Sequence, residues 1–335
     1  MRARDLGITI GEGDPGDRNA ITDVEGVLVG HSTLIEGDAV RTGVTVVVQP
    51  ETPLFAGCHR LNGNGELTGL EWVRESGLLT TPIGITNTFS VGVVRDAIAA
   101  RSSDDDAWSL PVVGETFDGF LNDIRGQHVK DAHVDAAFAA ASVEVEEGSV
   151  GGGTGMTCHE FKAGIGTASR TLGSHVVGVL VQANYGIRER FRVNGVPVGQ
   201  LIGDRIPKPS GASQTGSIIG IAATDAPLLP HQCHRLAQRI GLGVARTGGT
   251  AAHTSGDLFF AFATGNRGLE AEHGEVPLRM LADGEITPFY AAVIDATEEA
   301  ILNALLAAET MTGRDGNTAY ALSAALLLET LARQQ

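Results

Sequence analysis

The sequence predicts a single α/β domain in which helices cover the outside of stacked sheets. Short apolar runs with the length of buried strands alternate with stretches of helical periodicity along the 335 residues. No long linker interrupts this alternation, and 42% hydrophobic residues are enough for a large core. Aromatic residues make up only 5% of the chain, so we expect packing by Val, Leu, Ile and Ala.

Five segments are expected to be strands because they are apolar, rich in β-branched residues and bounded by turn-forming residues. They are residues 19–30, 42–49, 176–183, 217–223 and 258–264. The last three are continuous apolar runs, which predicts strands buried on both faces and therefore covered on both sides.

Four segments have the spacing of helices, at residues 64–76, 131–143, 228–245 and 288–309. The first ends at Gly77, a common helix stop, and the second is rich in Ala. In the last, the sequence from Asp295 to Glu298 is a possible N-terminal cap.

The net charge of the chain limits the classes of ligand that it is expected to bind. A net charge of -16 and a pI near 5.0 argue against a nucleic-acid surface and favour cationic or amine-bearing ligands. No signal-peptide pattern follows Met1, and the most apolar stretch, 319–331, is interrupted by Ser323 and Glu329. We therefore expect a cytoplasmic protein without a membrane partner, and the three cysteines suit a reducing compartment.

Two motifs that suggest a metal or a nucleotide are incomplete. Each cysteine is followed by a histidine, but the three pairs lack the short spacing of zinc modules, and adjacent strand residues face opposite sides. The glycine-rich run 151–155 lacks the Lys-Ser/Thr ending of a phosphate-binding loop, which favours a turn or a pocket wall. No metal and no cofactor is expected.

The dipeptide Gly216-Ser217 lies where a polar, Pro-interrupted segment, 203–215, meets the apolar run 217–223. The segment has the composition of a linker that can loop out to a cutting point. If the bond after Gly216 breaks, Ser217 carries both a hydroxyl nucleophile and a free α-amine that serves as its base. The alternative is an ordinary turn before a strand.

Two further segments carry polar side chains that suit such a nucleophile. Ser255 and Asp257 are two residues apart, which places them on one face of a strand, where a carboxylate can orient a nucleophile or an amine. Asn184 ends an expected strand, as an oxyanion donor requires, or it caps a turn. His253 is either a base or a loop histidine.

A short stretch after an apolar run holds three carboxylates, Glu115, Asp118 and Asp123. Such a cluster can bind a cation or an ammonium group. It can equally be a solvated acidic loop.

Four motifs follow one another in the second half of the chain: Gly-Ser-Ile-Ile at 216–219, Ala-Thr-Asp-Ala-Pro-Leu-Leu-Pro-His-Gln at 223–232, Ala-Arg-Thr-Gly-Gly at 245–249 and Ser-Gly-Asp at 255–257. In these motifs the chain resembles the DmpA/BapA family of N-terminal-serine aminopeptidases. Further matching segments, at 4–7, 19–23, 148–156, 161–167 and 307–316, extend the resemblance over nearly the whole chain.

The resemblance implies a precursor that cuts itself between Gly216 and Ser217 into an α subunit, 1–216, and a β subunit, 217–335. It implies a four-layer αββα sandwich, N-terminal-nucleophile-hydrolase-like with the DmpA-type connectivity. The expected assembly is a homo-oligomer, a tetramer of αβ pairs.

The same resemblance assigns roles to residues. Ser217 becomes the nucleophile on the first peptide bond of a short peptide or amide with a free N-terminus, and Ser255 and Asp257 tune it. Asn184 donates to the oxyanion, and Glu115 is the candidate for the substrate ammonium group.

Two positions depart from the family pattern. Several relatives carry Tyr where this chain has Phe117, so that a hydroxyl is missing and Phe117 lines the substrate pocket instead. The position of Asp257 is Glu in the β-peptidyl members. The shorter acid changes the distance over which a proton moves.

The predicted function is a self-processing aminopeptidase or amidase that releases small N-terminal residues from short peptides, amino-acid amides or esters. Alternatives are an acyltransferase of related architecture, a hydrolase of non-peptide amide oligomers, and a binding protein that never cleaves.

Overall fold

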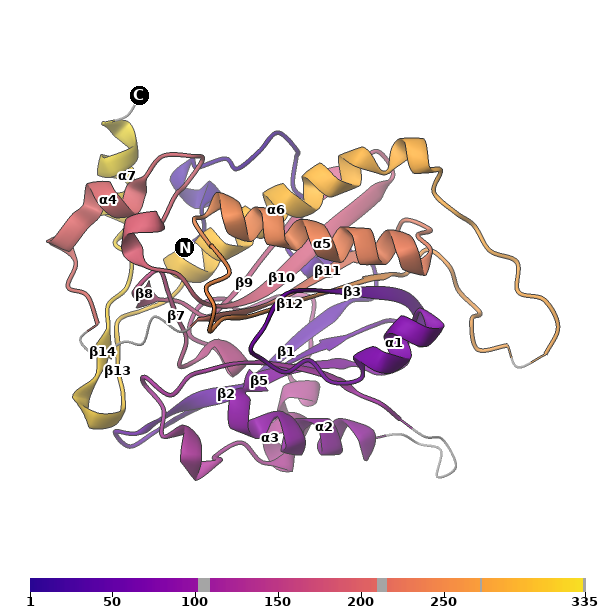
Figure 1. Ribbon diagram of the computed structural model, residues 1–335, viewed down its shortest axis with the longest axis horizontal. Coiled ribbons are helices and arrows are strands. Elements are labelled where there is room, and N and C mark those ends of the chain that lie inside the picture. The colour runs from indigo at the N-terminus through magenta and orange to yellow at the C-terminus, as the bar shows by residue number, and fades with distance from the viewer. Residues whose placement is uncertain (102–108, 210–215, 272, 334–335) are drawn as a thin grey trace.

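The computed structural model describes residues 1–101, 109–209, 216–271 and 273–333 as a four-layer molecule. Two sheets face each other, with α5 (Pro230–Arg246) and α6 (Thr287–Leu306) on one outer side, and α2 (Val91–Ala99) and α3 (Asp131–Ala139) on the other (Figure 1). The expected αββα sandwich is confirmed for the described residues. Among them, no helix is long and apolar enough to cross a bilayer.

The smaller sheet has the order β1-β2-β5-β6. Its strands are β1 (Leu28–Glu36), β2 (Val40–Val48), β5 (Ile83–Asn87) and β6 (Val112–Thr116). The pair β5 and β6 is parallel and the other two pairs are antiparallel. Because α2 lies between β5 and β6 in the chain, this pair forms a parallel crossover unit.

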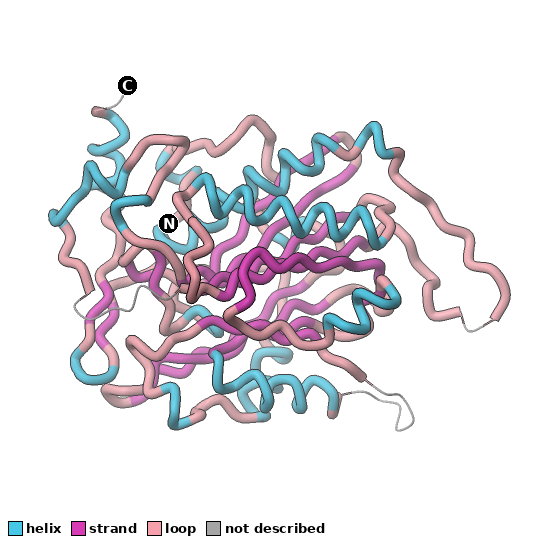
Figure 2. Tube along the Cα trace, in the orientation of Figure 1, coloured by secondary structure: helices cyan, strands magenta, loops and turns pink. Residues whose placement is uncertain are grey.

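The larger sheet has the order β4-β3-β12-β11-β10-β9. Its strands are β4 (Leu78–Leu79), β3 (Leu54–Gly63), β12 (Gly256–Ala263), β11 (Ser217–Thr224), β10 (His175–Asn184) and β9 (Ile165–Leu172). Only the central pair, β11 and β12, is parallel, and α5 connects its two strands. Figure 2 shows the two sheets stacked between the helices.

The remaining α-helices and strands are short. They are α1 (Leu70–Ser76), α4 (Val198–Ile202), α7 (Ala324–Ala332), and two small ladders, β7 (Thr157–Cys158) with β8 (Phe161–Lys162) and β13 (Met311–Thr312) with β14 (Thr318–Ala319).

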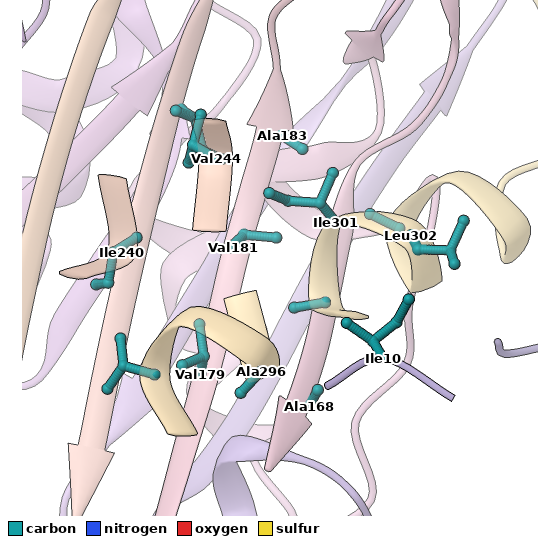
Figure 3. Packing of buried hydrophobic residues seen from close by; sticks show 14 of the residues in the cluster. Ile10, Ala168, Val179, Val181, Ala183, Ile240, Val244, Ala296, Ile301 and Leu302 are labelled. Carbon is teal, nitrogen blue, oxygen red and sulfur yellow. The ribbon is translucent and has the colours of Figure 1, made fainter. Parts of the chain in front are cut away.

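Three apolar layers hold the sandwich together. One lies between the larger sheet and α5 and α6, one between the two sheets, and one between the smaller sheet and α2 and α3. Figure 3 shows part of the first layer, in which Ile301 of α6 lies near Val181 of β10 and Leu302 of α6 lies on the side of Ile10. Removing this apolar surface from water is the main favourable term for the fold.

Several expected element boundaries were wrong, each for a local reason. In 19–30 a 3₁₀ turn (Ile21–Asp23) precedes β1, because the Asp23 carboxylate accepts from the Arg18 and Ala20 amides. In 64–76 the helix begins only at Leu70, after Gly69 at a φ of 73°. The carboxylate of Asp295 caps nothing: it lies inside α6 and pairs with Arg246, whereas Pro288 stands in the first turn.

Gly166 of β9 lies against α6 at a distance that admits no side chain. A Cβ at this position would lie 1.9 Å from the Ala300 carbonyl oxygen and 2.7 Å from the Ala304 amide nitrogen. Both atoms belong to the helix backbone, so the clash is relieved only by moving α6 away from the sheet.

We expect Gly166→Ala to lower the free energy of unfolding by about 1–3 kcal/mol, the usual cost of overpacking a core. Gly92 is the control: a Cβ there has no atom within 4 Å, so Gly92→Ala in α2 should be neutral or stabilising. Urea unfolding measures both in a Ser217→Ala background, which removes the serine expected to cut the chain. Equal effects of the two substitutions would contradict the close packing.

Candidate active site

Ser217 is the first residue of β11, in the middle of the larger sheet. Its neighbour across β10 is Asn184, and its neighbour across β12 is Gly256. Because β10 runs antiparallel to β11, and β12 runs parallel to it, the end of one strand and the beginnings of two others meet here. Ser217 is buried at 4% exposure.

The Gly216-Ser217 peptide bond lies among closely packed backbone groups. The Gly216 carbonyl oxygen accepts a hydrogen bond from the Gly256 amide at 3.2 Å. A Cβ at position 216 would lie 2.7 Å from the Tyr185 Cα and 3.1 Å from the Asn184 carbonyl oxygen. Glycine therefore fits here because the backbone of β10 leaves no room for a side chain. Of the linker-like segment before it, residues 210–215 lie outside the described residues.

Ser255 and Asp257 flank Gly256, the partner of Ser217. The Ser255 hydroxyl donates to Asp257 Oδ1 at 2.6 Å, and both side chains are buried. Burial raises the pKa of Asp257, and the hydrogen bond from Ser255 opposes that shift. Both residues line a small cavity of about 90 Å³ that Gly216 also lines, so the pair lies beside the Gly216-Ser217 bond.

Asn184 is oriented by two backbone groups. Its Oδ1 accepts from the Thr157 amide at 2.9 Å, and its Nδ2 donates to the Phe117 carbonyl at 3.0 Å. The Phe117 amide in turn donates to Ser217 Oγ at 3.3 Å. The amino side of Asn184 thus faces the same residue, Phe117, whose amide contacts Ser217.

A cavity of about 550 Å³ opens in front of Ser217. It is lined by Gly63, Asn64, Gly65, Glu66, Thr88, Glu115, Phe117, Gly216, Ser217 and Thr254. Phe117 is 45% exposed, so its ring forms part of the accessible wall.

Glu115 is the buried acid of this cavity, at 3% exposure. Its carboxylate accepts from the Glu66 amide at 3.0 Å and from the Thr88 hydroxyl. Burial raises the pKa of Glu115, and these two hydrogen bonds oppose the rise. A cationic group entering the cavity would meet an acceptor that is fixed in place.

The structure brings most of the predicted site residues together but separates the acidic cluster. Asp118 is fully buried and accepts from Asn122 at 3.0 Å, while Asp123 lies 3.5 Å from His128. Neither lines the cavity with Glu115. His253 is exposed and does not line it either.

The sequence did not predict the groups that bind the Glu115 carboxylate and the Asn184 side-chain amide. Thr88 follows β5, the Glu66 amide lies in the loop after β3, and Thr157 begins β7. The sequence Gly-Asn-Gly at 63–65 was a local sign that the chain passes close to another group.

The motifs that suggested a metal or a phosphate have other partners. His234 Nδ1 bonds the Cys58 carbonyl at 2.6 Å, and the His59 and His234 rings lie 6.0 Å apart. Over the described ranges, no three His, Cys, Asp or Glu side chains are placed to hold a metal ion. The amides of Gly151 and Gly152 donate to Thr33 and Thr45, so they are not free for a phosphate.

Comparison with known proteins shows which family the chain is similar to. The sequence profile of peptidase family S58 matches residues 19–319. The chain is 47% identical to the beta-peptidyl aminopeptidase BapA of Sphingosinicella microcystinivorans over 350 residues, which cover 95% of this chain and 88% of that protein.

Two solved structures share the fold. A beta-aminopeptidase from Burkholderia sp. superposes with a TM-score of 0.94 at 52% identity and 99% coverage of both chains. The L-aminopeptidase D-Ala-esterase/amidase of Ochrobactrum anthropi, described as a variant of the Ntn hydrolase fold, gives 0.91 at 40% identity, covering 99% and 98%. The expected N-terminal-nucleophile-hydrolase-like fold with DmpA-type connectivity is confirmed.

We expect Ser255→Ala to destabilise the fold in a pH-dependent way, by about 1.5–3 kcal/mol at neutral pH, because Asp257 loses the hydrogen bond to its buried charge. Asp257 titrates above its ordinary pKa, so the loss is full above that pKa and shrinks as falling pH protonates the acid. Urea unfolding of the Ser217→Ala chain at acidic and neutral pH measures it.

In an Asp257→Asn background, Ser255→Ala should instead have a smaller effect that does not change with pH. A loss of the same size at every pH in the Asp257 protein would contradict the assigned ionisation.

Proposed function

The chain belongs to peptidase family S58 and is a hydrolase of the aminopeptidase class; on that premise, we propose that it cuts itself before Ser217 and then acts through the new terminus. Its substrates are short peptides, amino-acid amides or esters with a free amine and a small N-terminal residue. The position of Ser217 carries the proposal: it heads a central strand, follows a glycine with a hydrogen-bonded carbonyl, and opens on a cavity with a buried acid.

Self-processing begins with attack of Ser217 Oγ on the Gly216 carbonyl carbon. The Gly256 amide faces the carbonyl oxygen, where negative charge develops. The C–N bond breaks as the nitrogen takes a proton, leaving an ester and a free α-amine on Ser217. Water then hydrolyses the ester, giving the Gly216 carboxylate and restoring the hydroxyl. The products are fragments 1–216 and 217–335 of what we treat as one domain.

The mature enzyme repeats this chemistry on an added substrate. The Ser217 α-amine, with an ordinary pKa of about 7.7–8.0, accepts the hydroxyl proton as Oγ attacks the first amide carbonyl. Asn184 Nδ2 donates to the tetrahedral oxyanion, and the leaving amine takes the proton. Water releases the acyl group in the second half of the cycle. Ser255 and Asp257 orient the amine beside Gly216.

Glu115 selects substrates with a free N-terminus. A substrate ammonium group in the cavity forms a charge-assisted hydrogen bond with a carboxylate that Thr88 and the Glu66 amide hold in place. Phe117 adds an apolar wall next to it. The names of the relatives suggest that β-residues belong in any substrate panel. The tetramer of αβ pairs and the cytoplasmic location stay predictions.

We expect the purified wild-type protein to give two bands on a denaturing gel, and Ser217→Ala to give one. Intact mass should place the cut between Gly216 and Ser217, because the Gly216 carbonyl oxygen is already bound by the Gly256 amide that would stabilise the developing charge. Ser255→Ala is the comparison, since it keeps the nucleophile and should be slowed rather than blocked. A wild type that stays in one piece and hydrolyses no amide would overturn the proposed function.

We expect Glu115→Gln to raise KM about 10- to 100-fold for amino-acid amides, because hydrogen bonds to charged groups are worth about 1.5–3 kcal/mol. Burial raises the pKa of Glu115, so the wild-type KM should rise as pH falls through that pKa, whereas the KM of the variant should not. Initial rates over a range of pH measure both.

The matched control is Glu66→Gln, which keeps the backbone amide that bonds Glu115 and neutralises the other carboxylate of the cavity wall. It should change KM less than Glu115→Gln does. An unchanged KM in Glu115→Gln, or an equal change with an N-acetylated substrate, would remove Glu115 from ammonium binding.

A further inference from the structure

Lys162 is a fully buried lysine close to the candidate site. It lies on β8, which pairs with β7 across a tight turn formed by His159 and Glu160 at φ values of 50° and 59°. The chain has three lysines, and the other two, Lys130 and Lys208, are exposed. Lys162 is 0% exposed.

The amine of Lys162 bonds only backbone oxygens. Its Nζ donates to the Met156 carbonyl at 3.0 Å and to the Ala163 carbonyl at 2.6 Å. Within the described residues it forms no ion pair, so its burial is not offset by an opposite charge. An apolar side chain of similar length would fill this volume without the cost of desolvating an amine.

Burial lowers the pKa of Lys162 to about 7. The ammonium form and the neutral amine both carry the two hydrogens that these bonds need. The contacts therefore persist in either protonation state.

The Met156 carbonyl connects this amine to Asn184. It belongs to the same peptide group as the Thr157 amide, which donates to Asn184 Oδ1 at 2.9 Å. An asparagine amide that loses this donor can turn over and present its oxygen where the oxyanion forms. The Met156 carbonyl also accepts from the Ala163 amide at 3.1 Å, so Lys162 is its second donor and completes the hold on the peptide plane. Donors on this carbonyl also strengthen the Thr157 N–H as a donor.

We propose that Lys162 is a positioning residue for Asn184: by holding the Met156 carbonyl, it aims the Thr157 amide at Asn184 Oδ1 and keeps Asn184 Nδ2 facing the reaction. This inference rests on the proposed function, in which Asn184 stabilises the oxyanion. Lys162 itself touches neither Ser217 nor the cavity lining.

A double-mutant cycle tests it, with Lys162→Met, Asn184→Ala and the double variant, assayed as purified mature enzyme on an amino-acid amide. Loss of one oxyanion donor lowers kcat by about 10²- to 10³-fold. We expect Lys162→Met to lower kcat by about 10-fold or more, within that limit, with little change in KM. In the Asn184→Ala background, Lys162→Met should cost almost nothing further, because its effect passes through the missing amide. Lys130→Met, which removes an exposed lysine that also bonds a carbonyl, should leave kcat unchanged.

Losses that multiply in the double variant would overturn the proposal, since they would mean a general structural role. An unchanged kcat in Lys162→Met or in Asn184→Ala would overturn it as well. If Lys162→Met does not fold, Lys162→Leu, which also lacks a donor for the Met156 carbonyl, is taken through the same cycle and judged in the same way. If the wild type is active and the two kcat losses multiply in the double variant, only this inference is refuted. If the wild type is inactive and uncut, the proposed function is refuted.

Discussion

The parallel pairing of β11 with β12 is the constraint on which the site depends. Parallel strands begin at the same edge of a sheet, so Ser217 at the start of β11 lies beside Gly256 at the start of β12. The antiparallel neighbour, β10, ends at this edge, which brings in Asn184. Strand direction alone thus gathers groups from three distant parts of the chain. The α5 crossover makes that direction possible, because parallel strands need a connection of this length.

The second sheet supplies the other half of the site. Glu115 and Phe117 come from the end of β6, and the cavity lies where this end faces the start of β11. The spacing of the sheets is held in an apolar interior by Gln182 of β10, whose amide donates to the Thr86 carbonyl at 2.9 Å and to the Thr116 hydroxyl at 2.8 Å. A buried amide with satisfied donors is specific in geometry, so it fixes how the two halves meet.

The sequence predicts the central strands well because they are continuous apolar runs: residues 176–183, 217–223 and 258–264 match β10, β11 and β12 closely. The prediction is less accurate where a single side chain or a single backbone angle sets the boundary of an element. Asp23 does so before β1, and Gly69 does so before α1. Among site residues, the contact of Ser255 with Asp257 was predictable because the two lie two residues apart where β12 begins. Thr88, Glu66 and Thr157 were not, because their partners are distant in the chain. For the acidic cluster both alternatives stayed open, because spacing does not reveal burial: Glu115 and Asp118 are buried, whereas the Asp123 side chain is half-exposed.

The strand order of the larger sheet has a consequence for a chain cut before Ser217. Fragment 217–335 then owns β11 and β12, while fragment 1–216 owns β10 and β9 on one side and β3 and β4 on the other. The two strands of fragment 217–335 therefore lie between strands of fragment 1–216 on both sides. Helices α5 and α6 of fragment 217–335 cover strands of both fragments. Pulling the fragments apart means opening two ladders and two apolar layers at once, so their association is as cooperative as folding itself. If two differently labelled batches of cut protein are mixed, fragments 1–216 and 217–335 should therefore not exchange between molecules as long as the protein stays folded.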